Sequence, residues 1–256
     1  MDRRIILSGA DNARDLGGIV NRAGCVIKRK MLIRSNALCN IDENDARVLS
    51  DGYGLRRIID LRMAKEAIER PDAAVSGAEY MNIPVFDESK IGISREKGAG
   101  TTIDSIENVP DMGRLYAEIV SDDVSVGRLS KIIDAIVSSS GAVLWHCSEG
   151  KDRCGITAML VLSLLDVDIS VVREDYLMTN IAAVPRAQAQ YQRIVDATGD
   201  IARAERVRRL FIADGAYFDA AVEAIEKQSG SVDGYIRERL GVSEEKKRAF
   251  MEKVME

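Results

Sequence analysis

Two unbroken apolar segments constrain the fold more than any other feature of this sequence. Residues 141–146 read Gly-Ala-Val-Leu-Trp-His, and residues 155–165 are strongly apolar throughout. A short apolar run of this kind is typical of a strand covered on both faces, and the longer run predicts a buried helix. Residues 147–153 therefore lead from a buried strand directly into a buried helix.

Short strands and helices alternate ahead of this loop. The patterns predict a hairpin around 17–24, strands at 31–33, 57–61 and 80–85, and helices at 42–50, 111–121 and 125–139. Residues 88–108 lose periodicity and gain glycine, serine and charge, which predicts a mobile loop. The alternation implies an α/β fold with a largely parallel central sheet flanked by helices.

The chain after Asp168 is predicted to be helical to its end. Helix breaks are expected at Pro185, 198–199, 214–215, 229–230 and 241–243. We therefore expect a single domain over 1–256. In it, an α/β core over 1–166 carries the loop 147–153, and a helical region over 167–256 packs on that core.

Charge and cysteine content narrow the classes of partner and compartment. A net charge of -5 argues against a general attraction to nucleic acid or anionic membranes, because both need surplus basic side chains. The N-terminal apolar run is too short for a signal peptide, and no stretch is long enough to span a bilayer. Four irregularly spaced cysteines fit a reducing cytoplasm. Export without a cleavable signal stays open.

The loop over 147–153, Cys-Ser-Glu-Gly-Lys-Asp-Arg, has the composition of an anion-binding site. Its successive backbone N–H groups can curl into a concave nest for phosphate oxygens, with Gly150 supplying conformational freedom. The amino end of the following helix adds partial positive charge. We expect the loop to bind phosphate through Ser148, Glu149, Gly150 and Lys151.

The side chains at the two ends of the loop supply the chemistry. The positive field of the loop is expected to lower the pKa of Cys147, so that a thiolate attacks phosphorus and water later releases the phosphate. Arg153 can turn its planar guanidinium onto two phosphate oxygens, a contact that a lysine cannot copy. Phosphoryl transfer needs mainly positioning and charge neutralisation, so catalysis is predicted without a metal or another cofactor.

The leaving oxygen also needs a proton. Asp152 is the nearest acid, Asp87 follows the predicted strand at 80–85, and Asp60 lies in the strand at 57–61. A well-placed general acid accelerates such a step by about 10²- to 10⁴-fold. The residues by themselves leave all three candidates open.

The string His-Cys-x-x-Gly-Lys-Asp-Arg at 146–153 resembles the bacterial branch of the protein tyrosine phosphatases. This branch of the Cys-x5-Arg superfamily also has dual-specificity and phosphoinositide-hydrolysing members. Other segments are similar to its motifs, in order along nearly the whole chain: Asn-x-Arg-Asp-Leu-Gly-Gly at 12–18, Arg34-Ser35, Ile-Asp-Leu-Arg at 59–62 with Glu66, Pro71-Asp72, Asp175-Tyr176 with Asn180, and 230–235.

This resemblance implies an α/β phosphatase fold and no metal cofactor. It implies Cys147 as nucleophile, Arg153 as phosphate ligand, Asp152 as the favoured acid and Lys151 as an added positive charge for polyanionic or lipid head groups. The helical region and 88–108 would cover the pocket. The implied partner is a phosphorylated protein, with phosphotyrosine foremost. A phosphoinositide substrate and a pseudophosphatase that only binds phosphoproteins are the alternatives.

Two positions depart from the pattern of this branch. Ala13 stands where an aromatic residue is usual, and Cys154 stands where a threonine or serine hydroxyl usually stabilises the thiolate. A thiol is a weaker hydrogen-bond donor than a hydroxyl. We therefore expect either slower turnover than a threonine version would show, or a redox role in which Cys154 pairs with Cys147.

Several residues have a simpler interpretation beside the functional one. His146 is expected to hold the loop through a backbone hydrogen bond rather than act as a general base. Lys151 has the alternative of a solvated charge. Zinc binding by Cys147 and Cys154 is disfavoured, because the spacing is wrong and further ligands are missing.

Other charged residues are also expected to be structural. The basic run Arg203, Arg206, Arg208 and Arg209 fits a solvated helix face better than a site for an acidic substrate. The charges of Arg14-Asp15 and of Asp60-Arg62 are expected to pair under the loop. A rhodanese-type sulfurtransferase also places a cysteine in an anion-binding loop, but Arg153 and the surrounding motifs speak against it.

Overall fold

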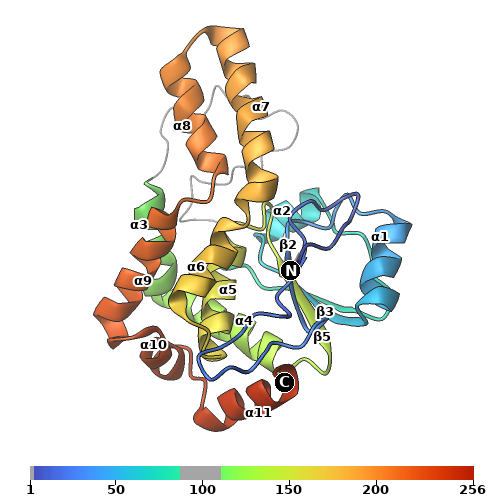
Figure 1. Ribbon diagram of the computed structural model, residues 1–256. Coiled ribbons are helices and arrows are strands. Elements are labelled where there is room, and N and C mark those ends of the chain that lie inside the picture. The colour runs from blue at the N-terminus through green and yellow to red at the C-terminus, as the bar shows by residue number, and fades with distance from the viewer. Residues whose placement is uncertain (1–2, 87–110) are drawn as a thin grey trace.

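The computed structural model describes residues 3–86 and 111–256, which form a five-stranded sheet flanked by helices (Figure 1). The strands are β1 Arg14–Asp15, β2 Leu32–Ser35, β3 Leu55–Asp60, β4 Glu79–Asn82 and β5 Ala142–His146. Their order is β1-β2-β5-β3-β4, with β1 antiparallel to β2 and every other neighbouring pair parallel. The predicted α/β fold with a largely parallel sheet is confirmed.

Strand β5 lies in the centre of the sheet. Its last residue, His146, is in register with Ser35 of β2 and Asp60 of β3. The carboxyl ends of three parallel strands thus meet at one edge, which is where open α/β sheets bind their ligands. The loop that starts at Cys147 leaves β5 at this edge.

The helices before residue 165 cover the sheet and lead out of the loop. They are α1 Glu43–Arg47, a π-helical turn at Val48–Gly52, α2 Ala64–Glu69, α3 Met112–Ser121, α4 Asp123–Val137 and α5 Asp152–Leu164. The helices predicted at 42–50, 111–121 and 125–139 are found as α1 with its π-helical turn, α3 and α4. Helix α5 begins before the predicted residue 155, so its first turn already carries Arg153.

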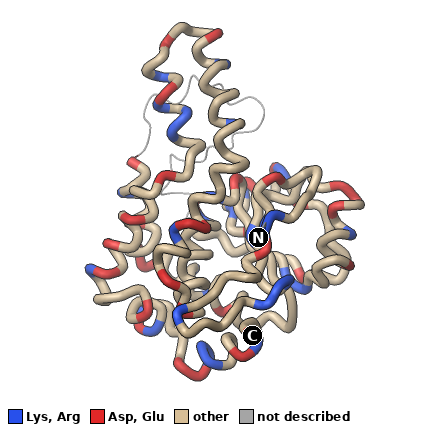
Figure 2. Tube along the Cα trace, viewed as in Figure 1, with Lys and Arg blue, Asp and Glu red and all other residues tan. Residues whose placement is uncertain are grey.

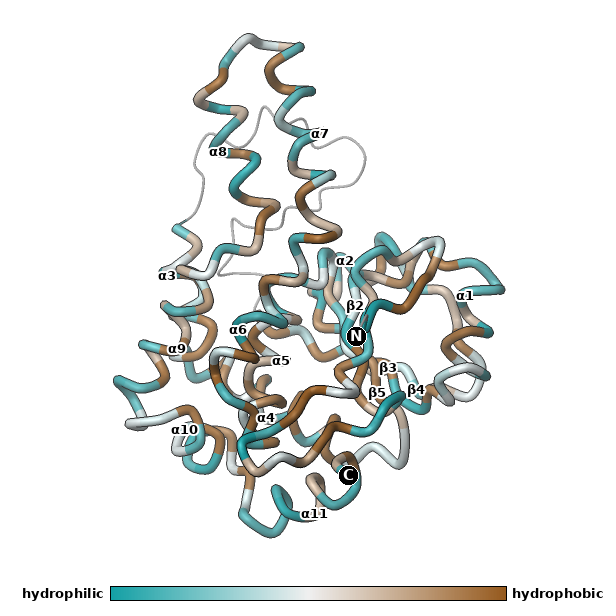
Figure 3. The backbone as a smooth tube through the Cα atoms, in the orientation of Figure 1, coloured by the Kyte–Doolittle hydropathy of each residue, from teal (hydrophilic) through white to brown (hydrophobic). Residues whose placement is uncertain are grey.

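Alternate residues of β5 enter hydrophobic cores on opposite faces of the sheet. Val143 and Trp145 pack in a large cluster with apolar residues of α3, α4 and α5. Ala142 and Leu144 pack in a second cluster with Ile58 of β3. Figure 3 shows the hydrophobic segments gathered where these strands and helices meet. A strand covered on both faces explains why residues 141–146 are apolar without alternation.

Six helices follow residue 168: α6 Ile169–Leu177, α7 Asn180–Thr198, α8 Ile201–Phe211, α9 Gly215–Ser229, α10 Val232–Glu238 and α11 Glu244–Val254. The predicted break at Pro185 is wrong, because this proline lies inside α7. Proline removes one N–H group from a helix and crowds the preceding turn. Helix α7 continues past this proline and packs along α8.

Helices α7 and α8 form a hairpin that projects from the rest of the molecule (Figure 1). Gly199 ends α7 in the left-handed region with φ 68°, and Ile194 packs against Val207 across the pair. Basic residues line α8 (Figure 2), where Arg208 and Arg209 both pair with Glu205. These short-range pairs fit the interpretation of 203–209 as a solvated helix face.

Two remaining expectations concern the first 110 residues. The predicted N-terminal hairpin is a turn in which Val20 pairs with Val26 in antiparallel fashion. The predicted loop 88–108 and the candidate acid Asp87 lie outside the described residues. Within 3–86 and 111–256, no helix is long and apolar enough to cross a membrane.

Candidate active site

The loop between β5 and α5 is held in shape by hydrogen bonds to its carbonyl groups. The carbonyl of Glu149 accepts a hydrogen bond from Nδ2 of Asn12 at 2.9 Å. The carbonyl of Gly150 accepts one from Nη2 of Arg34 at 3.0 Å, and that of Ser148 accepts one at 3.2 Å from a backbone amide beyond β2. Because three successive carbonyls point outward, the amides between them face the inside of the loop and can form an anion nest.

Gly150 is required at its position for two independent reasons. Its φ of 67° lies in the left-handed region, which a side chain disfavours. A Cβ atom there would also come within 2.7 Å of both Nδ2 of Asn12 and the carbonyl oxygen of Ser35. The close approach that anchors the loop to the segments around β1 and β2 therefore depends on this glycine.

Cys147 lies at the start of the loop and is only 2% exposed. Burial raises the pKa of Cys147 to about 11, while Arg153 and a hydrogen bond from the amide of Cys154 act in the opposite direction. The predicted lowering of this pKa is therefore wrong for this structure. Desolvation of the thiolate outweighs the local positive field.

Arg153 is fixed by a bidentate ion pair with Glu66 of α2. Its Nη1 and Nη2 atoms lie 2.7 and 3.1 Å from the two carboxylate oxygens, and Nη2 also donates to Oγ of Ser148 at 3.1 Å. Burial acts to raise the pKa of Glu66, but the charge and hydrogen bonds of Arg153 lower it overall. The Glu66 carboxylate thus holds the guanidinium beside the loop.

Asp152 accepts a hydrogen bond from Tyr116, which in turn contacts a second tyrosine of the covering helices. The hydroxyl of Tyr116 from α3 lies 2.7 Å from Oδ1 of Asp152 and 2.9 Å from the hydroxyl of Tyr176 in α6. Asp152 is the first residue of α5 and directly precedes Arg153 in the sequence. The structure therefore gives Asp152 a fixed orientation at the end of the loop.

Lys151 is not a solvated charge, because it is only 1% exposed. Its Nζ donates to the carbonyl of Leu210 at 2.6 Å and to that of Ile212 at 3.4 Å, both at the carboxyl end of α8. The same atom lies 3.3 Å from Oδ1 of Asp152. Lys151 therefore ties the loop to the projecting hairpin in this structure.

His146 faces a carboxylate rather than a backbone acceptor. Its Nε2 lies 2.8 Å from Oδ2 of Asp72, and the predicted backbone hydrogen bond of the ring is not found within residues 3–86 and 111–256. His146, Asp60 and Asp72 have the mutual spacing of a metal site. However, Nη2 of Arg62 lies 2.8 Å from Asp60 and 2.9 Å from Asp72, so this buried guanidinium already supplies the positive charge.

Asp60 is a poor candidate for the general acid. Burial acts to raise its pKa, but hydrogen bonds from Arg62 and the neighbouring charge of His146 lower it overall. The carboxylate also accepts a hydrogen bond from Tyr80 at 2.7 Å and is fully buried. A fully enclosed carboxyl group cannot reach a leaving oxygen, whereas the side chain of Asp152 is 21% exposed. The geometry therefore favours Asp152 over Asp60.

The charges expected to pair under the loop are only partly as predicted. Asp60 does pair with Arg62. Arg14 instead pairs with Asp175 of α6, at 3.3 Å, while Asp15 accepts hydrogen bonds from backbone amides. Sequence proximity misled here, because neighbouring residues of a strand point to opposite faces of the sheet.

The structure brings in side chains for which sequence reasoning gave no role. In the sequence, Glu66, Asn12 and Arg34 stand out only as parts of motifs, and Tyr116 belongs to none of these motifs. The side chain of Glu149 points away from the loop to Arg186 of α7, at 2.8 Å. A lone tyrosine in an amphipathic helix carries no sequence signal that would distinguish it from a core residue.

A buried parallel strand, a nest-forming loop with a cysteine at its start, and a fixed arginine at its end define the class of cysteine-dependent phosphatases. Residues 5–256 match the tyrosine phosphatase family, and the chain therefore belongs to that family.

Two sequence relatives of known description agree with this family. The chain is 25% identical over 267 residues to the triple specificity protein phosphatase PtpB of Mycobacterium tuberculosis, covering 93% of this chain and 94% of that protein. It is 25% identical over 224 residues to a tyrosine-protein phosphatase of Nostoc commune, covering 83% and 70% respectively. The crystal structure of TpbA of P. aeruginosa aligns with a TM-score of 0.35 at 14% identity, covering 77% of this chain and 90% of that one.

Proposed function

We propose that this protein hydrolyses phosphate monoesters without a metal ion, with protein phosphotyrosine as its main substrate. The observation that carries the proposal is the fixed position of Arg153 beside the Cys147 loop, set by Glu66 and Ser148. Phosphoryl transfer is accelerated chiefly by positioning and by neutralising the phosphate oxygens. The inward amides and the guanidinium meet both needs.

The proposed reaction has two steps. The Cys147 thiolate attacks phosphorus, and a cysteinyl phosphate forms as the ester P–O bond breaks. Asp152 donates its proton to the leaving oxygen. Asp152 then accepts a proton from the water that attacks phosphorus, and the thiolate leaves. Arg153 and the loop amides bind the phosphate oxygens throughout.

The setting of the reaction is also part of the proposal. We assign residues 1–256 to a single phosphatase domain that acts in the cytoplasm on phosphorylated proteins. Four cysteines at irregular spacing support a reducing compartment. Dual specificity is supported by the description of the M. tuberculosis relative as triple specificity. Phosphoinositides are the second substrate class to test, because Lys151 would offer them a charge if it left its α8 carbonyls.

The test is phosphate release from phosphotyrosyl, phosphoseryl and phosphothreonyl peptides and from phosphoinositides, with a metal chelator present. We expect turnover of the phosphotyrosyl peptide, none with Cys147→Ser, and full activity with Cys25→Ser, which removes an exposed cysteine as a matched control. Turnover of phosphoinositides alone would change the substrate class. Phosphopeptide binding without turnover in the wild type would indicate a binding protein, and dependence on metal would contradict the mechanism.

A further inference from the structure

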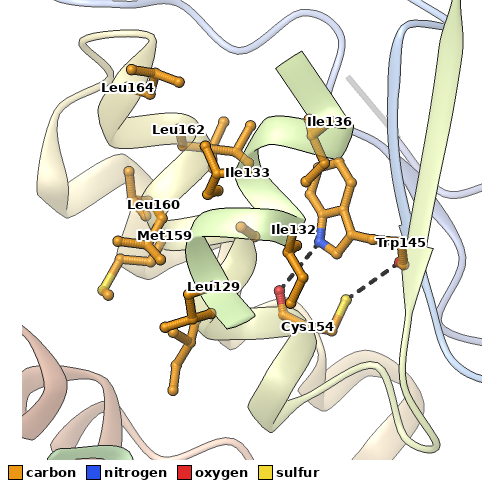
Figure 4. Packing of buried hydrophobic residues seen from close by; sticks show 14 of the residues in the cluster. Leu129, Ile132, Ile133, Ile136, Trp145, Cys154, Met159, Leu160, Leu162 and Leu164 are labelled. Atoms are coloured by element: carbon orange, nitrogen blue, oxygen red, sulfur yellow. Dashed lines mark hydrogen bonds between the residues drawn. The ribbon is translucent and has the colours of Figure 1, made fainter. Parts of the chain in front are cut away.

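The position of Cys154 is more specific than that of an ordinary core residue. Its side chain is fully buried, and its backbone amide donates a hydrogen bond to the sulfur of Cys147. Figure 4 shows its own sulfur turned to the carbonyl of Trp145 in β5, at 3.6 Å, while the indole of Trp145 donates to the carbonyl of Cys154 at 3.4 Å. Two hydrogen bonds therefore hold Cys154 against β5, the strand that ends directly before Cys147.

This arrangement puts two thiols within reach of each other. A disulfide needs Cα atoms about 4.4–6.8 Å apart, a separation compatible with an amide that already contacts the partner sulfur. The hydrogen bond from the Cys154 sulfur to the carbonyl of Trp145 is weak, because a thiol is a weak donor. Rotation about χ1 between staggered positions can release the sulfur from Trp145 and turn it towards Cys147.

A buried cation also lies beside Cys154. Arg34 interacts with the Cys154 side chain, while its Nη1 atom binds Asp175 and its Nη2 atom binds the loop carbonyl of Gly150. The Nε atom of Arg34 has no hydrogen-bond partner among the described residues. Positive charge at this place stabilises negative charge that develops on the Cys154 sulfur when it acts as a nucleophile.

We propose that Cys154 is a resolving thiol, and that a hydroperoxide converts Cys147 and Cys154 into a reversible disulfide. The proposal rests on the reactivity assigned to Cys147 under the proposed function. The Cys147 thiolate attacks the O–O bond of the hydroperoxide and becomes a sulfenic acid, while the remaining alkoxide or hydroxide takes up a proton. Sulfur loses two electrons and the peroxide gains them.

The second step closes the disulfide. The Cys154 sulfur attacks the sulfenic sulfur, the S–S bond forms, and hydroxide leaves with the Cys154 proton as water. A small dithiol then restores both thiols by exchange. The disulfide blocks further oxidation of Cys147 to sulfinic acid, which is irreversible for most proteins. The thiol at 154 thus protects the nucleophile in a way that a threonine cannot.

The first measurement is the intact mass and peptide map after hydrogen peroxide treatment at about pH 8, where more thiolate is present than at pH 7. The wild type is expected to lose two hydrogens and yield a linked Cys147–Cys154 peptide. The Cys154→Thr variant is expected to gain two or three oxygens on Cys147 instead. Because mass is read without turnover, this result stands even if the phosphatase proposal fails.

Recovery of activity is the second measurement. After dithiothreitol, the wild type and the matched control Cys39→Thr should regain most of their phosphatase activity, and Cys154→Thr should regain little. Circular dichroism of Cys154→Thr checks its fold, and the wild-type mass alone tests the proposal if that variant does not fold. Wild-type protein over-oxidised at Cys147 without a linked peptide would overturn the proposal, as would equal recovery in Cys154→Thr.

Discussion

At the scale of single residues, the site depends on charges that are balanced one against another. Glu66 takes two N–H donors of Arg153, and Ser148 takes a third. A guanidinium has five such donors, so two remain for substrate oxygens. The role of Glu66 is therefore to position Arg153 rather than to touch the phosphate.

The Glu66→Gln substitution should lower kcat/KM by about 100-fold, because a small displacement of the Arg153 guanidinium from its catalytic position costs a rate factor of this size. The amide keeps the shape of the side chain but removes the counter-charge of Arg153. Phosphopeptide kinetics across substrate concentrations measure the effect. Glu69→Gln on the same helix, whose partner Lys65 is exposed, is the control and should stay near wild type. Equal activity in both variants would show that Arg153 needs no such support.

The raised pKa of Cys147 predicts that its reactivity towards alkylating reagents increases with pH. Because burial raises its pKa to about 11, the thiolate fraction should grow as pH rises. The rate of alkylation by iodoacetamide at Cys147 should increase by about tenfold per pH unit up to about that pKa. Mass mapping of the labelled peptide measures it, with exposed Cys25 as an internal reference. A rate that levels off near pH 7 would mean that the loop field outweighs burial after all.

At the scale of elements, the strand–loop–helix unit could be predicted from the sequence. The tertiary contacts that hold this unit in place could not. The apolar runs at 141–146 and 155–165 predicted β5 and α5, because a doubly covered strand and a buried helix leave that pattern. The contact of Lys151 with α8 left no such trace, since it joins residues far apart in the chain through backbone carbonyls. The continuation of α7 through Pro185 is also contrary to the local propensity of proline.

Gly150→Ala should lower the free energy of unfolding by about 1–3 kcal/mol, because a non-glycine residue is strained at positive φ and its Cβ would meet Asn12. Thermal and denaturant unfolding measure this change. Gly127, inside α4 with open space around its Cβ position, provides the matched control. There, Gly127→Ala should raise stability by about 0.5–1 kcal/mol, because alanine favours the helix. Destabilisation of similar size at both positions would refute the argument.

The contact between the loop and α8 gives a second prediction at this scale. Lys151→Met keeps an apolar stem of similar length but removes the donor to the carbonyls of Leu210 and Ile212. Amide hydrogen exchange should become faster in α8 while α4 keeps its protection. Lys131→Met, on α4 and away from the loop, is the control. Unchanged exchange in α8 would mean that apolar packing alone holds the hairpin.

At the scale of the whole molecule, one buried carboxylate joins the sheet half of the chain to its helical half. Asp175 of α6 binds Arg3 at 2.8 Å, Arg14 of β1 at 3.3 Å and Arg34 of β2 at 2.8 Å. Burial acts to raise its pKa, but Arg14 and Arg34 lower it strongly overall. Because Arg34 also binds the loop carbonyl of Gly150, the stability of the fold and the shape of the site share this group.

Asp175→Asn should therefore destabilise the protein by about 3–5 kcal/mol, because it leaves buried arginines without their counter-charge. A group whose pKa is lowered on folding stabilises fully above its unfolded value, about 3.9, and loses this contribution as pH falls. Denaturant unfolding from neutral pH down to about pH 3 should thus show a steeper acid loss for the wild type than for Asp175→Asn. Asp219→Asn removes the half-exposed partner of Arg173 and should change stability by less than about 1 kcal/mol. If the free energy of unfolding falls with pH equally in the wild type and in Asp175→Asn, the Asp175 carboxylate does not contribute to the acid sensitivity of the fold.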